Sequence, residues 1–196
     1  MSDQRKNGFE MNAFPKDSAI ILVHGAWANG SCWNNVILPL QRHGLKVICA
    51  PIPLSSLNDD SAALRRVLER TNGPVVLVGH AYAGAVIGAA DETRVKSLVF
   101  VAALAPDEGE TVSQVFYRGE PHPDAPKLTP DPHGLIWMPE EGFRRAVAHR
   151  ASADHISIMA ALQRPIALKC IEDASPGARM ENEAIMVLAR RRRPHD

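Results

Sequence analysis

A chain of 196 residues, of which 45% are hydrophobic and 22% are charged, has the size and composition of one globular domain. Its 22 basic and 22 acidic residues give a formal net charge of zero, which argues against a partner bound through charge, such as a nucleic acid or a membrane surface. Its three cysteines share no metal-ligand spacing and predict reduced thiols in a cytoplasmic protein. We expect neither a metal nor a cofactor, and the composition leaves the oligomeric state open.

The first part of the chain is a polar segment followed by alternating apolar strand segments and amphipathic helix segments. Residues 1–18 are polar and predict a loose N-terminal leader, because they lack the apolar core of a signal peptide or anchor. From residue 19 to 106 the expected strands are 19–23, 45–50, 75–78 and 97–104, and the expected helices are 31–43, 56–70 and about 83–90. Gly44 lies where the end of the first helix favours a positive φ. This order predicts an α/β core with a mostly parallel sheet and flanking helices.

The chain changes character after residue 106. Residues 107–141 are rich in Pro, Gly, Asp and Glu and show no strand periodicity, and helices are expected near Arg144 and over 153–162. We interpret 107–172 as a small cap inserted over the carboxyl ends of the strands. Residues 173–196 contain the run Arg190 to Arg193 and resemble neither the core nor the cap in sequence pattern, so we treat them as an atypical tail.

The stretch PVVLVGHAYAGAVIGAA at 74–90 joins an apolar strand to a helix through a turn of small residues, which is the shape of a nucleophile elbow. In the motif G-x-S-x-G the middle residue is the attacking serine, and here that position is Ala81. Acyl transfer also needs backbone N–H donors for an oxyanion hole, and we expect them at Ala26, in the loop after the first strand, and at Tyr82. The residues expected to line the pocket around them are His24, Gly25, Trp27 and His80.

With these motifs the chain resembles the α/β-hydrolase superfamily. It is similar to small bacterial esterase-type members that are akin to plant methyl-ester esterases and hydroxynitrile lyases. The matching segments are IILVHGAWANGSCW, LSSLNDDSAALRRVL, PVVLVGHAYAGAVI and SLVFVAALAPDEGE, and the likeness continues through the cap to RPIALKC, about residues 19–172. The resemblance implies an α/β-hydrolase fold and an esterase-type pocket for small ester or carbonyl compounds. It also implies a serine at the position of Ala81, and an acid and a histidine that follow the cap.

The chain departs from this family pattern at the catalytic positions. Ala81 has no oxygen to attack with, and losing a triad nucleophile lowers kcat on the order of 10⁶-fold. Asp154 and His155 are adjacent, so their side chains diverge on a helix, and His195 lies one residue from the chain end. The acid and the histidine therefore cannot be identified. The function stays open between a serine-hydrolase relative, a non-catalytic small-molecule binding module and an inactive remnant, and Ala81 is either natural or engineered.

The tail suggests a reason for the missing residues. If its codons are read one nucleotide later, Met180 and Met186 each give a tryptophan, and permitted codons make the stretch resemble the family's next strand and acid-bearing loop. We therefore expect residues from about 178 on to be a frameshift product and the fold to be truncated after the cap. In that case no strand follows Cys170, and the strand 97–104 forms an exposed apolar sheet edge that promotes aggregation.

Overall fold

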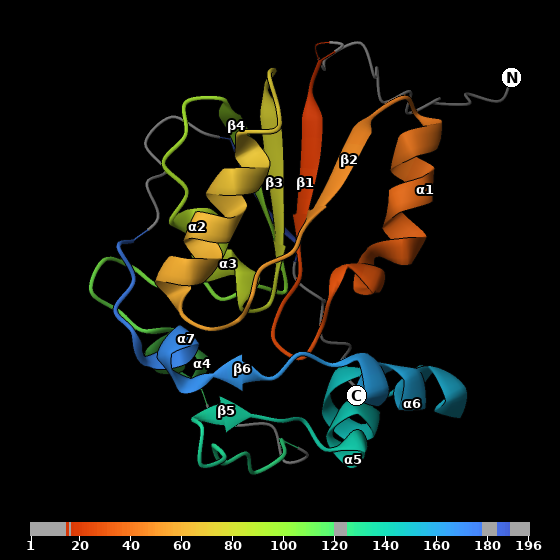
Figure 1. Cartoon of the computed structure of the whole chain (residues 1–196), viewed down its shortest axis with the longest axis vertical. Coiled ribbons are helices and arrows are strands. Elements are labelled where there is room, and N and C mark those ends of the chain that lie inside the picture. The colour runs from red at the N-terminus through yellow and green to blue at the C-terminus, as the bar shows by residue number, and fades with distance from the viewer. Residues whose placement is uncertain (1–14, 16, 120–124, 178–183, 189–196) are drawn as a thin grey trace, which may run out of the picture.

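The computed structural model describes residues 15, 17–119, 125–177 and 184–188, the last five by their backbone alone. Most of the expected leader, the end of the tail, His122 and His195 lie outside these residues. Five parallel strands form the central sheet in the order β2-β1-β3-β4-β7 (Figure 1). Their bounds are β1 (Ala19–Val23), β2 (Lys46–Ala50), β3 (Val75–His80), β4 (Val95–Val101) and β7 (Ala184–Leu188).

The register of the sheet brings the strand ends together. Val23, the last residue of β1, lies beside Ala50 of β2 and Gly79 of β3. The continuous apolar run AIILV is buried on both faces, as a central parallel strand requires. Because the strands are parallel, the loops that follow them all leave from one edge of the sheet, the carboxyl edge.

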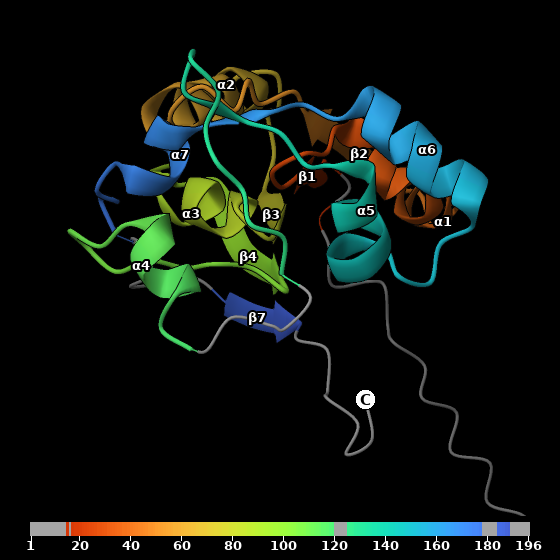
Figure 2. The same cartoon turned by 90° about the horizontal axis from the view of Figure 1, so that it is seen from below.

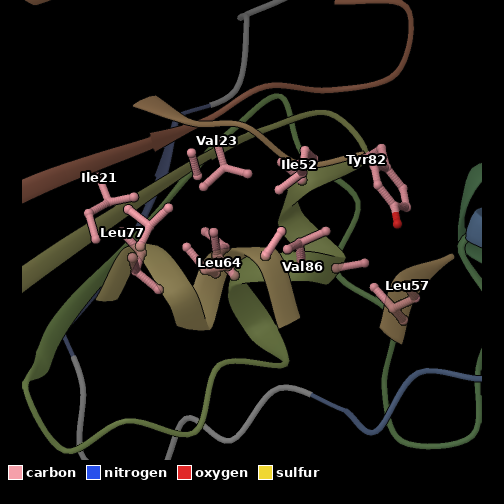
Figure 3. Close-up of a cluster of buried hydrophobic side chains, with 14 of the residues drawn as sticks. Ile21, Val23, Ile52, Leu57, Leu64, Leu77, Tyr82 and Val86 are labelled. Carbon is pink, nitrogen blue, oxygen red and sulfur yellow. The ribbon is translucent and has the colours of Figure 1, made fainter. Parts of the chain in front are cut away.

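Helices cover both faces of the sheet. On one face lie the 3₁₀ turn η2 (Gly30–Trp33) and α1 (Asn34–Arg42), and on the other lie α2 (Leu57–Leu68) and α3 (Ala83–Gly88). Ser56 caps α2, because its side chain accepts a hydrogen bond from the amide of Asp59 at 3.0 Å. Figure 3 shows the larger of the two cores, in which Ile21 and Leu77 of the sheet face Leu64 and Val86 of the helices.

The cap lies below the carboxyl edge of the sheet in Figure 1, and Figure 2 shows it from its outer side. Its elements are β5 (Leu135–Ile136), α5 (Glu140–Gly142), the π-helical turn η3 (Phe143–Val147), α6 (Ala153–Leu162) and β6 (Ile166–Ala167). Two short helices flank it, α4 (Val112–Phe116) and α7 (Leu168–Glu172). The expectation that 107–141 holds no strand is wrong: β5 pairs antiparallel with β6, and its two residues are too few to show a periodicity.

The expected exposed edge at β4 is also wrong. Residues Ser97 to Val101 pair in parallel with β7, so a strand does follow Cys170. The in-frame run AIMVL is itself a short apolar segment of the kind that forms strands, which the interpretation of the tail overlooked. Nothing in the pairing addresses the reading frame, and the frameshift hypothesis stays a prediction.

Candidate active site

The segment 79–88 folds as a strand, a sharp turn and a helix, with Ala81 at the turn between β3 and α3. Ala81 has a φ of 51°, in the left-handed region that is unfavourable for residues other than glycine. The turn is possible because its flanking glycines lack a side chain. A Cβ on Gly84 would lie 2.4 Å from the carbonyl oxygen of Leu104, and one on Gly79 would lie 2.7 Å from that of Ala83.

The loop after β1 packs directly against this turn. Gly25 is buried, and a Cβ on it would lie 2.9 Å from the carbonyl oxygen of His80 and 3.0 Å from the Cβ of Ala81. Within the part of the chain that the structure describes, the backbone amides of Ala26 and Tyr82 donate to no carbonyl or side chain. The structure thus places Gly25 next to Ala81, and neither of the two amides has an acceptor among the described residues.

Backbone strain gathers at this edge of the sheet. Four non-glycine residues among those described have a positive φ: Trp27, Leu54, Ala81 and Ala102. Each follows the carboxyl end of a strand, β1, β2, β3 and β4 respectively. Such conformations cost about 1–3 kcal/mol each and cluster where a fold holds a binding or catalytic site. The carboxyl edge is therefore the candidate site on backbone geometry alone.

Two histidines adjoin the turn, and both are neutral near pH 7. His24 is 1% exposed, and its Nδ1 donates to the carbonyl oxygen of Gly25 at 3.0 Å, which leaves Nε2 as a buried atom without a described partner. Burial lowers the pKa of His24, and the positive charge of Arg164 lowers it further. Burial also lowers the pKa of His80, whose ring meets Trp33 edge-on at 6.4 Å between centroids.

The side chain of Tyr82 is buried in the core. Its hydroxyl donates to Oδ2 of Asp60 at 2.7 Å, and the amide of Leu54 donates to Oδ1 at 2.7 Å. The thiol of Cys170 lies 3.7 Å from the same Oδ2. Burial raises the pKa of the Asp60 carboxyl, which its hydrogen bonds partly counteract, and burial raises that of Cys170 to about 12.

Asp60 was not identified from the sequence, although a signal was present. It lies three residues after Leu57 and four before Leu64, so the three side chains share one face of α2, and that face is buried. An acidic residue on a buried helix face requires partners that satisfy its oxygens. Through them Asp60 connects α2 to the residue that follows Ala81.

Trp27 connects the site to the cap. Its indole Nε1 donates to the carbonyl oxygen of Ile136 in β5 at 2.9 Å, and its ring packs against the cap cluster of Met138, Phe143 and Ile156. Asn29 in the same loop donates from Nδ2 to the carbonyl oxygen of Leu162 at 3.0 Å. The loop that carries the Ala26 amide is thus held between the sheet and the cap.

The structure brings no acid–histidine pair to the turn from the expected candidates. Asp154 and His155 are exposed on α6, and His133 is exposed in the cap. The described residues contain no group of three or more His, Cys, Asp or Glu side chains arranged to hold a metal ion. No helix in the described part of the chain has both the length and the apolar character to cross a bilayer.

Comparisons with known proteins agree with this geometry. The carbendazim hydrolyzing esterase of Nocardioides sp. (strain SG-4G) is 28% identical over 116 residues, which are 52% of this chain and 48% of that protein. This chain spans about half the length of the curated relatives it matches: 48% of this esterase and 48% of a second relative.

Two solved structures share the fold. An extracellular α/β-hydrolase from a Paenibacillus species has a TM-score of 0.67 at 17% identity and covers 87% of this chain and 77% of its own. Tomato methylketone synthase I complexed with 2-tridecanone has a TM-score of 0.61 at 21% identity, with coverages of 79% and 69%. A sequence model of the alpha/beta hydrolase family matches residues 20–192, which is most of the chain. The chain belongs to the alpha/beta hydrolase family.

Proposed function

We propose that this chain holds an esterase-type pocket at the carboxyl edge of its sheet, which binds a small ester or carbonyl compound. The observation that carries the proposal is the pair of backbone amides at Ala26 and Tyr82, in the strand-end loops beside Ala81, which have no acceptor among the described residues. A carbonyl oxygen accepts hydrogen bonds from such a pair, and more strongly as negative charge develops on it. One relative is named as an esterase and one structural neighbour is described with a bound ketone, which supports this ligand class.

Turnover by the serine route is nearly absent in this proposal. Ala81 presents a methyl group where the resemblance implies a hydroxyl, so no acyl-enzyme can form at this position. The neutral His24 and His80 flank the turn, but neither is oriented by an acidic partner in the described residues. Without the nucleophile, what remains is the electrostatic contribution of the amides, which accounts for about 10³–10⁴ of a triad enzyme's rate over water.

A non-catalytic binding module is the second candidate, and the strained turn favours it. Ala81 keeps a φ of 51° although no serine needs to be presented there. Tyr82 enters α3 directly after the turn, so its amide belongs to the start of that helix, where amides have no acceptor within the helix. A fold that retains this arrangement without a nucleophile retains the means to bind a carbonyl group.

A binding experiment tests the proposal. We expect dimethyl succinate, a small neutral ester, to bind saturably to the full chain in isothermal titration calorimetry. Ala81→Leu should abolish the binding by filling the site, whereas Ala153→Leu, at an exposed position on α6, should leave it unchanged. Binding that is insensitive to Ala81→Leu would place the ligand elsewhere, and no binding to the wild type would favour the inactive remnant.

Hydrolysis of 4-nitrophenyl acetate separates the two candidates. This activated ester has a good leaving group, so a serine can react with it without a general acid. Ala81→Ser should therefore exceed the wild type, which has the contribution of the amides but no nucleophile. Wild-type turnover that equals that of Ala81→Ser would show that Ala81 is not the nucleophile position.

We also propose that the partner is a small molecule met in the cytoplasm. The three cysteines of the described residues, Cys32, Cys49 and Cys170, are free thiols, which supports a reducing compartment. Fractionation of cells that express the full chain tests the location, and recovery from the culture medium would contradict it.

A further inference from the structure

Within the part of the chain that the structure describes, one half-buried arginine has no counter-ion. Among the described lysines and arginines, only Arg94 and Arg164 are half-buried rather than exposed. Arg94 pairs with Glu92 at 2.8 Å. Arg164 has no ion pair and no hydrogen bond within the described residues. Withdrawing a guanidinium from water without a partner costs free energy, and an anion that pairs with it would offset this cost.

Arg164 lies in the segment that crosses the carboxyl edge of the sheet between α6 and β6 (Figure 2). Both ends of this segment are tied to loops that follow core strands. Leu162 accepts the hydrogen bond from Asn29 at 3.0 Å, and the amide of Ala167 donates to Leu54 at 2.9 Å. Pro165 restricts the preceding residue to an extended backbone, so the position of Arg164 between these two ties is defined.

The backbone on both sides of Arg164 lies against the loop that carries the Ala26 amide. Leu162 accepts a hydrogen bond from Asn29 of that loop, and Ile166 pairs with Ile136, which accepts one from Trp27. Burial is the main cause that lowers the pKa of His24, and the positive charge of Arg164 also lowers it. His24 precedes Gly25 and Ala26 directly, and its Nε2 is a buried polar atom without a described partner. Arg164, the imidazole of His24 and the amides of Ala26 and Tyr82 thus all belong to segments at the carboxyl edge of the sheet.

We propose that the pocket selects esters or ketones that also carry a carboxylate, which pairs with the guanidinium of Arg164 while the ligand's carbonyl oxygen accepts hydrogen bonds from the amides of Ala26 and Tyr82. The inference rests on the proposed function and specifies its ligand. A guanidinium presents parallel N–H donors that match the two oxygens of a carboxylate, and such charge-assisted pairs are roughly twice as strong as neutral ones. A neutral diester can accept hydrogen bonds from the two amides, but it has no carboxylate to pair with Arg164.

The test compares matched ligands on the full chain by isothermal titration calorimetry. The probes are the monomethyl esters of succinate, glutarate and adipate, with their dimethyl esters as neutral counterparts. For at least one spacer length we expect the monoester to bind about tenfold more tightly or better, since hydrogen bonds to charged groups contribute about that much. Arg164→Gln should remove this preference.

Two further variants keep the result interpretable. Arg150→Gln removes an exposed arginine of the same cap, so it matches the change in net charge and should leave the preference intact. Arg164→Lys keeps the charge without the planar fork and should retain part of the preference. If Arg164→Gln melts at a lower temperature than the wild type, Arg164→Lys shows whether the preference depends on the charge or on the stability of the fold.

The outcomes separate this inference from the proposed function. Diester binding without a monoester preference overturns the carboxylate site and leaves the ester pocket standing. A preference that survives Arg164→Gln, or that Arg150→Gln removes equally, also overturns it. If neither ester binds, both the inference and the proposed function fail.

Discussion

At the scale of single residues, Ala81 separates the geometry of the elbow from its chemistry. The turn is imposed by its neighbours: Gly79 and Gly84 permit the close approach of Ala83 and Leu104, and the amide of Leu104 donates to the carbonyl oxygen of Ala81 at 3.0 Å. These contacts hold φ at 51° whatever side chain the central residue carries. The strain at Ala81 is consequently a property of the surrounding fold, and it is measurable.

Replacing Ala81 by glycine should leave the protein as stable or stabilise it by up to roughly 1 kcal/mol. A left-handed backbone costs an L-residue about 1–2 kcal/mol, whereas the additional entropy that glycine loses on folding is about 0.5–1 kcal/mol. The matched control is Ala85→Gly, at a buried helical position of α3, which should destabilise by about 1 kcal/mol or more. Urea denaturation of both variants measures the contrast. Equal destabilisation by the two would show that the turn at Ala81 is unstrained.

Sequence patterns predict some of these residues and miss others for a physical reason. Gly44 was expected to adopt a positive φ at a helix end, and its φ is 77°. The small residues at 79–84 predicted the turn, because their steric requirement is local. Asp60 and Arg164 were missed, since their roles depend on segments far away in the chain: Asp60 contacts Tyr82 and Cys170, and the segment of Arg164 is bonded to Asn29 and Leu54. The spacing on α2 indicates that Asp60 is buried, but nothing local in the sequence identifies its partners.

At the scale of elements, the Asp60 carboxyl joins three of them. It lies on α2, receives the hydroxyl of Tyr82 from the start of α3, and contacts the thiol of Cys170 on α7. In Figure 3 the Tyr82 ring lies at one end of the buried cluster, on the side of Leu57 of α2. The position of the Tyr82 amide beside Ala81 therefore depends on a buried acid whose ionisation costs free energy.

This junction should make part of the stability depend on pH. The pKa of Asp60 is raised in the folded chain above its ordinary value of 3.8, with burial as the main cause. Its protonated form therefore stabilises the fold fully below pH 3.8, and this contribution is lost as the pH rises through the folded-state pKa. Asp60→Asn is neutral throughout, so the stability of the wild type relative to this variant should fall as the pH rises through that window.

Urea denaturation of both proteins across the acid to neutral range provides the measurement, and the difference cancels the other carboxyls. Tyr82→Phe is the matched variant, because losing the hydroxyl that favours ionised Asp60 should raise the pKa further and widen the pH window. A difference between wild type and Asp60→Asn that is independent of pH would refute the role assigned to this carboxyl.

The elements themselves were predicted where their signal is long and local. The runs of β1 to β4 and the face of α2 appear within a few residues of the expected bounds. The two-residue strands β5 and β6 are stabilised by pairing with each other across the cap, which no pattern of two residues can indicate. The strand β7 differs from these two, because its apolar run AIMVL is a local signal. Its flanks are rich in charged residues, and the prediction for the tail followed the flanks.

At the scale of the whole molecule, β7 decides whether the sheet ends in a covered or an open edge. Leu98 and Phe100 of β4 are buried, and the backbone of Ser97 to Val101 is paired on both sides, with β3 and with β7. Without β7, one row of the N–H and C=O groups of β4 would be unpaired beside apolar side chains. Such an edge templates pairing with another chain.

Truncating the chain after Gly177 should therefore cause association. We expect the 1–177 fragment to form larger species as its concentration rises, in light scattering and sedimentation velocity, under conditions in which the full chain scatters less. Hydrogen exchange at Ser97 to Val101 should be faster in the fragment, since half of their backbone partners are gone. Substituting Val99→Lys in the fragment should reduce the association by placing a charge on the new edge. Equal exchange at β4 in both chains would show that β7 does not protect it in solution.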